Sequence, residues 1–141
     1  MKSEATVKKT LDYPIEEVWE IFTNRQDYKW RNEVVDFEVT GENSFEETNH
    51  NDMVTRYEVL KKDPLKYFEI QMNNKIISGI FDITFEKIEE NKTKVTLHQV
   101  NDYDSLLTYL TNTFFLSLEK VLNRYIYQVE MKLKARNITR K

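Results

Sequence analysis

The spacing of apolar residues divides the chain into three parts. Residues 3–11 alternate loosely between polar and apolar side chains, which predicts a first strand. The following segment has the i, i+3, i+4, i+7 spacing of one helix face, in Ile15, Val18, Trp19 and Phe22. Pro14 suits the first position of this helix, because its missing N–H has no helical partner there. We expect a second short helical piece over Asn24 to Arg31 before the chain becomes extended.

Residues 33–101 consist of short alternating segments separated by polar turns such as Gly41-Glu42-Asn43 and Asn73-Asn74. Six strands with turn signals every 8–12 residues or so predict an antiparallel meander. Each strand has one apolar face, so the sheet is expected to bury one side only.

The remaining segment, Asp104 to Arg136, carries a helical stripe: Phe114 (or Phe115), Leu118, Val121, Leu122, Tyr125, Val129 and Leu133. Threonine and asparagine in its first two turns are poor helix formers, so this start is expected to be irregular or kinked. A helix of about 30 residues would be about 45 Å long. Since a domain of this size is roughly 35–40 Å across, the helix must cross it, and only the apolar side of the sheet can receive it.

These elements predict a single α+β domain, residues 1–141. We expect a curved seven-stranded antiparallel sheet wrapped around a long C-terminal helix, with two short helices after the first strand. Gly79 lies in the middle of a strand and suits a bulge or kink there. Curling a sheet around a helix tends to leave space between them, so we expect a mostly apolar internal cavity or deep cleft.

Composition excludes several function classes. The formal net charge of −3 argues against a nucleic-acid partner. The absence of cysteine excludes disulfides and thiolate metal sites, and two distant glycines cannot form a phosphate-binding loop. With only two histidines, a three-His metal site is excluded, so we expect no cofactor and no metal. No signal peptide or integral membrane segment is recognisable, which favours a cytoplasmic location.

Two segments carry a family resemblance. Tyr13-Pro14-Ile15-Glu16-Glu17-Val18-Trp19 and Tyr28-Lys29-Trp30-Arg31 resemble the opening of the START-like helix-grip superfamily (SRPBCC), which includes the birch-pollen-allergen-like proteins. Phe115, Leu118, Leu122 and Tyr125 are similar to its gripping helix. The nearest branch is the polyketide cyclase/dehydrase and lipid-transport-like one. The resemblance implies a helix-grip fold and a cavity for lipids, polyketides or similar molecules. The glycine-rich loop of the pollen-allergen branch is absent, so its ligands are not implied.

We expect the cavity to be lined by nine residues: Trp30, Phe37, Tyr57, Phe68, Phe81, Gln99, Phe114, Leu118 and Tyr125. The rings of Tyr57 and Tyr125 should face inward, where each hydroxyl needs a partner. That partner is either a ligand or a neighbouring group or buried water. Trp30 either contacts the ligand or packs against the fold, and Trp19 belongs to the core.

One carboxylate, Glu47, shares a strand face with Phe45 and could point inward, where burial would raise its pKa and make it an acid. The alternative is an inward charge near a sheet edge, which blocks aggregation. His98 should face solvent, since Gln99 is in phase with the inward residues. No residue is assigned a catalytic role.

Three functions remain in competition. The first is a binding module for a small lipophilic molecule. The second is an enzyme of the cyclase or dehydratase type, for which Glu47, Tyr57 and Gln99 are the candidates. The third is a co-chaperone-like or regulatory interaction module that uses the convex face of the sheet or the basic segment from Lys132 to Lys141. That segment is also typical of a solvated helix end.

Overall fold

The computed structural model describes residues 1–115 and 117–139, and all of their side chains except those of residues 112–115 and 139. The elements follow the chain in the order β1 (Lys2–Leu11), α1 (Ile15–Thr23), β2 (Val34–Val39), β3 (Ser44–Asn49), β4 (Val54–Asp63), β5 (Tyr67–Asn73), β6 (Ile77–Glu89), β7 (Lys92–Tyr103), α2 (Leu106–Phe115) and α3 (Leu118–Thr139). The predicted first strand, first helix and six-stranded meander are confirmed.

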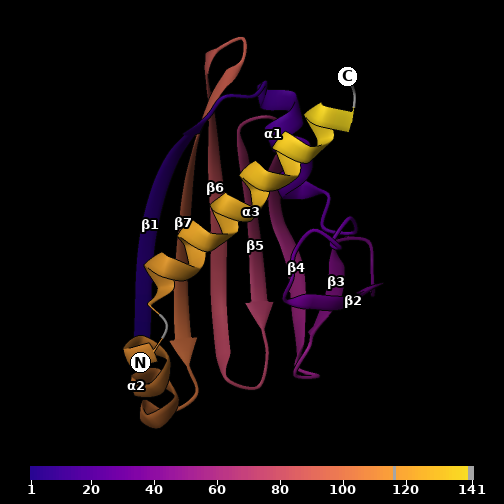
Figure 1. Cartoon of the computed structure of the whole chain (residues 1–141). Helices are drawn as coiled ribbons and strands as arrows, with labels where there is room; N and C mark the ends of the chain where they lie inside the picture. Colours follow the sequence, from indigo (N-terminus) through magenta and orange to yellow (C-terminus); the bar gives the residue numbers. More distant parts are fainter. Residues whose placement is uncertain (116, 140–141) are drawn as a thin grey trace.

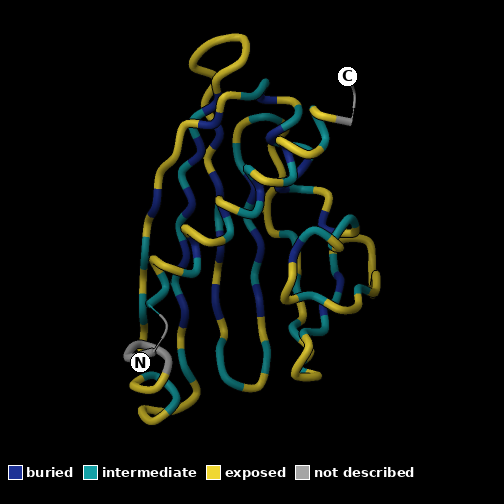
Figure 2. Tube along the Cα trace, viewed as in Figure 1, coloured by how far each residue is buried: buried dark blue, intermediate teal, exposed yellow. Residues whose placement is uncertain are grey.

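The seven strands form one antiparallel sheet in the order β1-β7-β6-β5-β4-β3-β2. Buried and less buried residues alternate along β6 and β7, as expected of a sheet with one covered face. Figure 2 shows this alternation as dark blue segments along the central strands. The meander leaves β2 at one edge, and no residue of β2 is fully buried.

Helix α3 crosses the covered face of the sheet diagonally (Figure 1). Its buried side is formed by residues at helical spacing, which are Leu122, Ile126, Val129 and Leu133. These side chains pack with the inward residues of the strands and with α1 in one hydrophobic core. Two ion pairs also connect α3 to its neighbours: Arg136 Nη1 lies 2.8 Å from Glu20 Oε2 of α1, and Lys9 Nζ of β1 lies 3.8 Å from Glu130 Oε1.

Only one short helix follows β1, so the expectation of a second one over residues 24–31 is wrong. Turns replace it, in which Trp30 donates its indole N–H to the Asp27 carbonyl at 2.7 Å. Both Arg25 and Arg31 direct their guanidinium groups to one buried carboxylate. Residues six apart in an α-helix point about 120° away from each other. A helix would therefore separate the two arginines that the turns bring together.

The long C-terminal helix is confirmed as α3, but it begins at Leu118 rather than near Asp104, because the residues before it form a separate helix, α2. The irregularity expected in the first two turns of the segment is not found there, because those turns belong to the continuous helix α2. The interruption lies further along the chain, between Phe115 at the end of α2 and Leu118 at the start of α3. Each helix has a serine N-cap: Ser105 Oγ accepts the Thr108 N–H at 3.1 Å, and Ser117 Oγ accepts the Lys120 N–H at 3.3 Å. With 22 residues, α3 is about 33 Å long.

Gly79 is not a bulge, contrary to expectation. Its pairing with Met72 on one side and Asn101 on the other continues in regular register. The glycine is needed for a close approach instead, because a Cβ atom there would lie 2.5 Å from Asn101 Oδ1 and 2.8 Å from the Val100 carbonyl oxygen. The missing side chain leaves room for Asn101, whose Oδ1 accepts a hydrogen bond from Gln99 Nε2 at 2.9 Å.

We expect Gly79→Ala to lower the free energy of unfolding by about 1–3 kcal/mol, because Asn101 and the neighbouring strand must shift. Urea denaturation followed by circular dichroism measures this loss. Gly41→Ala is the matched control, since its Cβ would meet only the side chain of Ser44, at the exposed turn between β2 and β3. Equal stability of the two variants would contradict the assigned role of Gly79.

Candidate functional site

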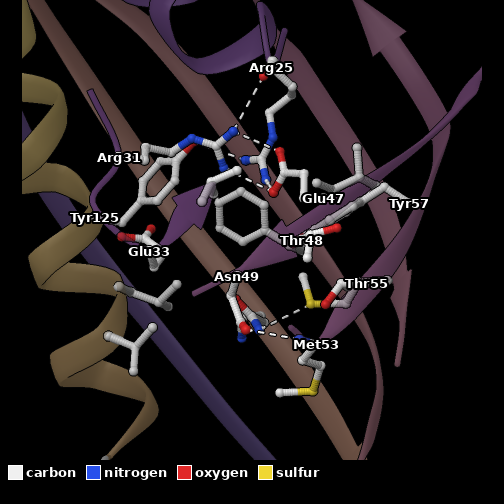
Figure 3. Close-up of a pocket in the computed structure, with 17 residues that line it drawn as sticks. Arg25, Arg31, Glu33, Glu47, Thr48, Asn49, Met53, Thr55, Tyr57 and Tyr125 are labelled. Carbon is white, nitrogen blue, oxygen red and sulfur yellow. Dashed lines mark hydrogen bonds and ion pairs between the residues drawn. The ribbon is translucent and has the colours of Figure 1, made fainter. Parts of the chain in front are cut away.

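A pocket with a volume of about 250 Å³ lies between the covered face of the sheet and α3. Its walls come from the turns after α1, from β2 to β7 and from α3 (Figure 3). Most of the wall is apolar, including Met53, Ile70, Met72, Val121 and Leu122. Three charged side chains, those of Arg25, Arg31 and Glu47, meet at one end of the pocket.

These three residues form a buried ionic cluster, which we call the Arg–Glu–Arg cluster. Arg31 forms a bidentate ion pair with the Glu47 carboxylate: Nη2 lies 2.7 Å from Oε2, and Nη1 lies 3.1 Å from Oε1. Arg25 Nη2 lies 3.1 Å from Oε1. The exposed fractions are 9% for Arg25, 3% for Arg31 and 5% for Glu47. Figure 3 shows the three side chains converging from the turns and from β3.

Backbone placement explains this convergence. Glu47 occupies the same face of β3 as Phe45, so the two-residue period of the strand points it inward. Arg31 also donates from Nη2 to the Arg25 carbonyl at 3.3 Å, which ties the two ends of the turn segment together. The sheet therefore supplies the anion, and the turns after α1 supply both cations.

The cluster is charged at neutral pH. Burial raises the pKa of Glu47, but the charges and hydrogen bonds of Arg25 and Arg31 outweigh it and hold that pKa below its usual value. Burial alone would lower the pKa of Arg25, yet Glu47 and the neighbouring tyrosines raise it. The expectation of a raised pKa for Glu47 is therefore wrong. An ionised carboxylate with both oxygens occupied cannot act as a general acid.

Aromatic rings surround the cationic end of the pocket. The guanidinium carbon of Arg25 lies 5.1 Å from the ring centroid of Tyr57 and 5.9 Å from that of Tyr125, within the range of cation–π attraction. Arg25 Nη1 also donates to the Tyr125 hydroxyl at 3.0 Å. Burial, and then the charge of Glu47, raise the pKa of Tyr57 to about 12 against the opposing effect of the arginines. Tyr57 is therefore neutral at physiological pH.

The opposite wall contains a second polar group. Gln99 is buried, and its Nε2 donates to Asn101 Oδ1 at 2.9 Å and contacts Met72 Sδ at 3.7 Å. Asn101 of this pair lies against Gly79, which has no side chain to occupy the same space. Asn49 shapes the mouth of the pocket, since its Oδ1 accepts the Met53 N–H at 3.0 Å and thereby orients the turn before β4.

Four of the nine expected residues line this pocket, namely Tyr57, Phe81, Gln99 and Tyr125. The structure places four others outside its wall. Trp30 packs edge-on against Tyr125 with ring centroids 6.1 Å apart, and Phe37 stacks on Phe45 at 5.1 Å. Phe68 is fully buried in the core, and Leu118 packs at the margin of the core. The side chain of Phe114 lies outside the described part of the structure.

The two arginines of the cluster were missed by sequence reasoning. The available signal was Glu47 itself, because an inward carboxylate requires a buried cation. Strand β3 lies next to the edge strand β2, as the edge-protection interpretation expected, but Glu47 is not an isolated inward charge, because both arginines pair with it. Trp19 packs against the core as expected, and its ring centroid lies 5.0 Å from that of Phe85.

Neither histidine takes part in the site. His98 lies on the outer face of the sheet, where Nε2 is 2.6 Å from Glu4 Oε2 and Nδ1 is 2.9 Å from Asp82 Oδ2. His50 lies in the turn after β3. Among the described residues, no group of three or more His, Asp or Glu side chains has the geometry to hold a metal ion. No helix in the described ranges is long and apolar enough to cross a membrane.

We expect Glu47→Gln to lower the free energy of unfolding by about 3–5 kcal/mol at pH 7, because two buried guanidiniums lose their counter-ion. Glu46→Gln is the matched control on the same strand, where Glu46 pairs with the exposed Arg56. It should cost at most about 1 kcal/mol.

The pH dependence has a definite sign. A lowered pKa in the folded state means that Glu47 stabilises the fold above its unfolded-state pKa of about 4.3, and that this contribution disappears as the pH falls below that value. Urea denaturation between neutral and acid pH should show the wild type and Glu47→Gln converging at low pH. A constant difference at every pH would contradict the ionised state of Glu47.

Solved structures share this fold. A START superfamily protein from Mycobacterium smegmatis superposes with a TM-score of 0.78 at 7% identity, covering 94% of this chain and 97% of that chain. A conserved protein from Geobacillus kaustophilus gives 0.72 at 12% identity and 96% coverage of both chains. Norcoclaurine synthase from Thalictrum flavum, in complex with dopamine and hydroxybenzaldehyde, gives 0.71 at 6% identity, covering 96% of this chain and 88% of that chain. At these identities the likeness shows the fold alone.

Sequence comparison supplies the family. No curated protein matches the chain significantly. The family model described as polyketide cyclase / dehydrase and lipid transport matches residues 2–123, which is most of the chain. This match agrees with the helix-grip architecture and confirms the resemblance seen in the sequence. The chain therefore belongs to the polyketide cyclase/dehydrase and lipid transport family.

Proposed function

We propose that this chain binds one small, mostly apolar molecule in the pocket between the sheet and α3. The observation that carries the proposal is the pocket itself, about 250 Å³ in volume and lined largely by methionine, aliphatic and aromatic side chains. Ligand sites are typically concave and apolar with a few placed polar groups. Membership of a family described by polyketide chemistry and lipid transport supports the same conclusion.

Size limits the ligand. A volume of about 250 Å³ equals roughly eight times the ~30 Å³ that a water molecule occupies in the liquid. A molecule of about ten non-hydrogen atoms therefore fills the pocket, such as a medium-length acyl chain or a single substituted ring, and a larger molecule extends beyond it. A full membrane lipid would have to leave most of its chains outside.

The described site favours binding over cyclase or dehydratase chemistry. Such chemistry needs a group that gives or takes a proton in the cavity. Glu47 is held ionised by two arginines, and Tyr57 has a pKa raised to about 12. Gln99 does not titrate, so the three candidates named for the enzyme hypothesis provide no proton donor or acceptor poised near neutral pH.

One observation favours a second candidate function, that of an interaction module. Three leucines on α2 are largely exposed: Leu106, Leu107 and Leu110. Helix α2 lies beside the ends of β1 and β7, at the opposite edge of the sheet from β2 (Figure 1). A function based on these leucines would therefore be independent of the pocket, and pocket variants would leave it unchanged.

Blocking the pocket tests the binding function. We expect the neutral apolar dye N-phenylnaphthylamine to bind the purified protein with increased fluorescence. Val121→Trp should reduce that binding at least about tenfold, because the indole fills space now open between α3 and the sheet. Val54→Trp introduces the same ring at an exposed position of β4 and is the matched control. Unchanged dye binding by folded Val121→Trp would contradict the proposal.

A further inference from the structure

The Arg–Glu–Arg cluster contains one more positive charge than it can neutralise. Two guanidiniums share the single carboxylate of Glu47, and all three side chains line the pocket. The cluster is at most 9% exposed, so water screens the excess charge poorly. A buried cation without a counter-ion is costly, and an anion entering the pocket would relieve that cost.

Other charges near the pocket do not cancel this excess. Glu33 is the one further ionisable acid in the described wall of the pocket, and it is an exposed residue that receives a hydrogen bond from Gln128 Nε2 at 3.3 Å. Solvent therefore screens its charge. Of the two tyrosines at this end, Tyr57 is neutral at pH 7, because burial, followed by the charge of Glu47, raises its pKa to about 12.

Hydrogen-bond donors also outnumber acceptors at this end of the pocket. The Nε atoms of Arg25 and Arg31 are buried and have no hydrogen-bond partner among the described residues. The Tyr125 hydroxyl accepts from Arg25, which leaves its own proton to donate. Glu47 already accepts three hydrogen bonds from the arginines. The site lacks an acceptor, and an anionic oxygen is the strongest one.

We propose that the ligand is a lipophilic carboxylate, whose charged group pairs with the Arg–Glu–Arg cluster while its apolar part lies against Met53, Met72 and Leu122. This inference rests on the proposed binding function and specifies its ligand class. A carboxylate matches the single excess charge, whereas a phosphate monoester carries nearly two. Guanidinium and carboxylate also have complementary planar geometry.

Three probes of equal chain length separate charge from apolarity. Octanoate, octanol and octylamine are each titrated at pH 7 against the wild-type protein loaded with N-phenylnaphthylamine. We expect octanoate to displace the dye at a concentration roughly ten- to hundredfold lower than octanol, the range for a hydrogen bond to a charged group. Octylamine should be the weakest of the three, because its ammonium group meets a positive site.

Two variants shift the charge of the site in opposite directions. Arg25→Gln leaves a neutral Arg31–Glu47 pair and should remove the preference for octanoate over octanol. Glu47→Gln leaves two guanidiniums and should increase that preference at least about tenfold. If the cluster had only a structural role, both substitutions would weaken binding of octanoate and octanol alike and would leave the preference between them unchanged. Arg56→Gln removes an exposed arginine outside the pocket and is the matched control. Thermal unfolding identifies variants that do not fold, and the wild-type titrations do not depend on them.

The outcomes distinguish the two proposals. Displacement by octanol as strong as by octanoate, or stronger displacement by octylamine, would overturn the carboxylate assignment and leave apolar binding intact. Failure of the dye and of all three probes to bind would overturn the binding function itself. Preference for octanoate that persists in folded Arg25→Gln would also overturn the assignment, because the charge would then act elsewhere.

Discussion

A carboxylate buried between two guanidiniums is the constraint on which this end of the molecule depends. Glu47 comes from β3, while Arg25 and Arg31 come from the turns after α1. Their ion pairs attach the β2–β3 edge of the sheet to the part of the chain that precedes it. Strand β2 offers no fully buried residue, so apolar packing alone holds this edge weakly. The same cluster also gives the pocket its polar end.

The site therefore combines a preformed apolar wall with a rigid charged end. Bidentate pairing fixes Arg31, and the ring of Tyr57 together with the hydroxyl of Tyr125 fixes Arg25. A cationic group held in place before binding loses little conformational freedom when an anion arrives. A fold alone does not determine the function of a protein. In this chain the specific chemistry lies in a few polar side chains added to a common scaffold.

Apolar periodicity predicted most of the fold, because burial on one sheet face and one helix face leaves a direct trace in the sequence. The segments that departed from prediction are those governed by other forces. The conformation of residues 24–31 is determined by the pairing of Arg25 and Arg31 with the carboxylate of Glu47. The break before α3 is fixed by a serine cap, a local hydrogen bond that apolar spacing does not reveal.

The candidate site was only partly predictable. In-phase residues such as Tyr57 and Gln99 could be placed inward from strand alternation alone. The partners of Glu47 could not, because the pairing joins segments 16 and 22 residues apart in the sequence through irregular turns. The role of Gly79 was also not predictable. A glycine in the middle of a strand indicated a bend, whereas the structure shows that the Asn101 side chain of the neighbouring strand occupies the space beside it.

Chain order has a consequence for how the protein assembles during synthesis. The sheet, the turns and both arginines precede the last helix in the chain, so α3 is the last element of the site to be synthesised. Tyr125, which contacts Arg25, belongs to that final helix. Because α3 supplies part of the pocket wall, the pocket is complete only once this helix has docked, and a molecule that occupies the pocket favours the docked helix by mass action.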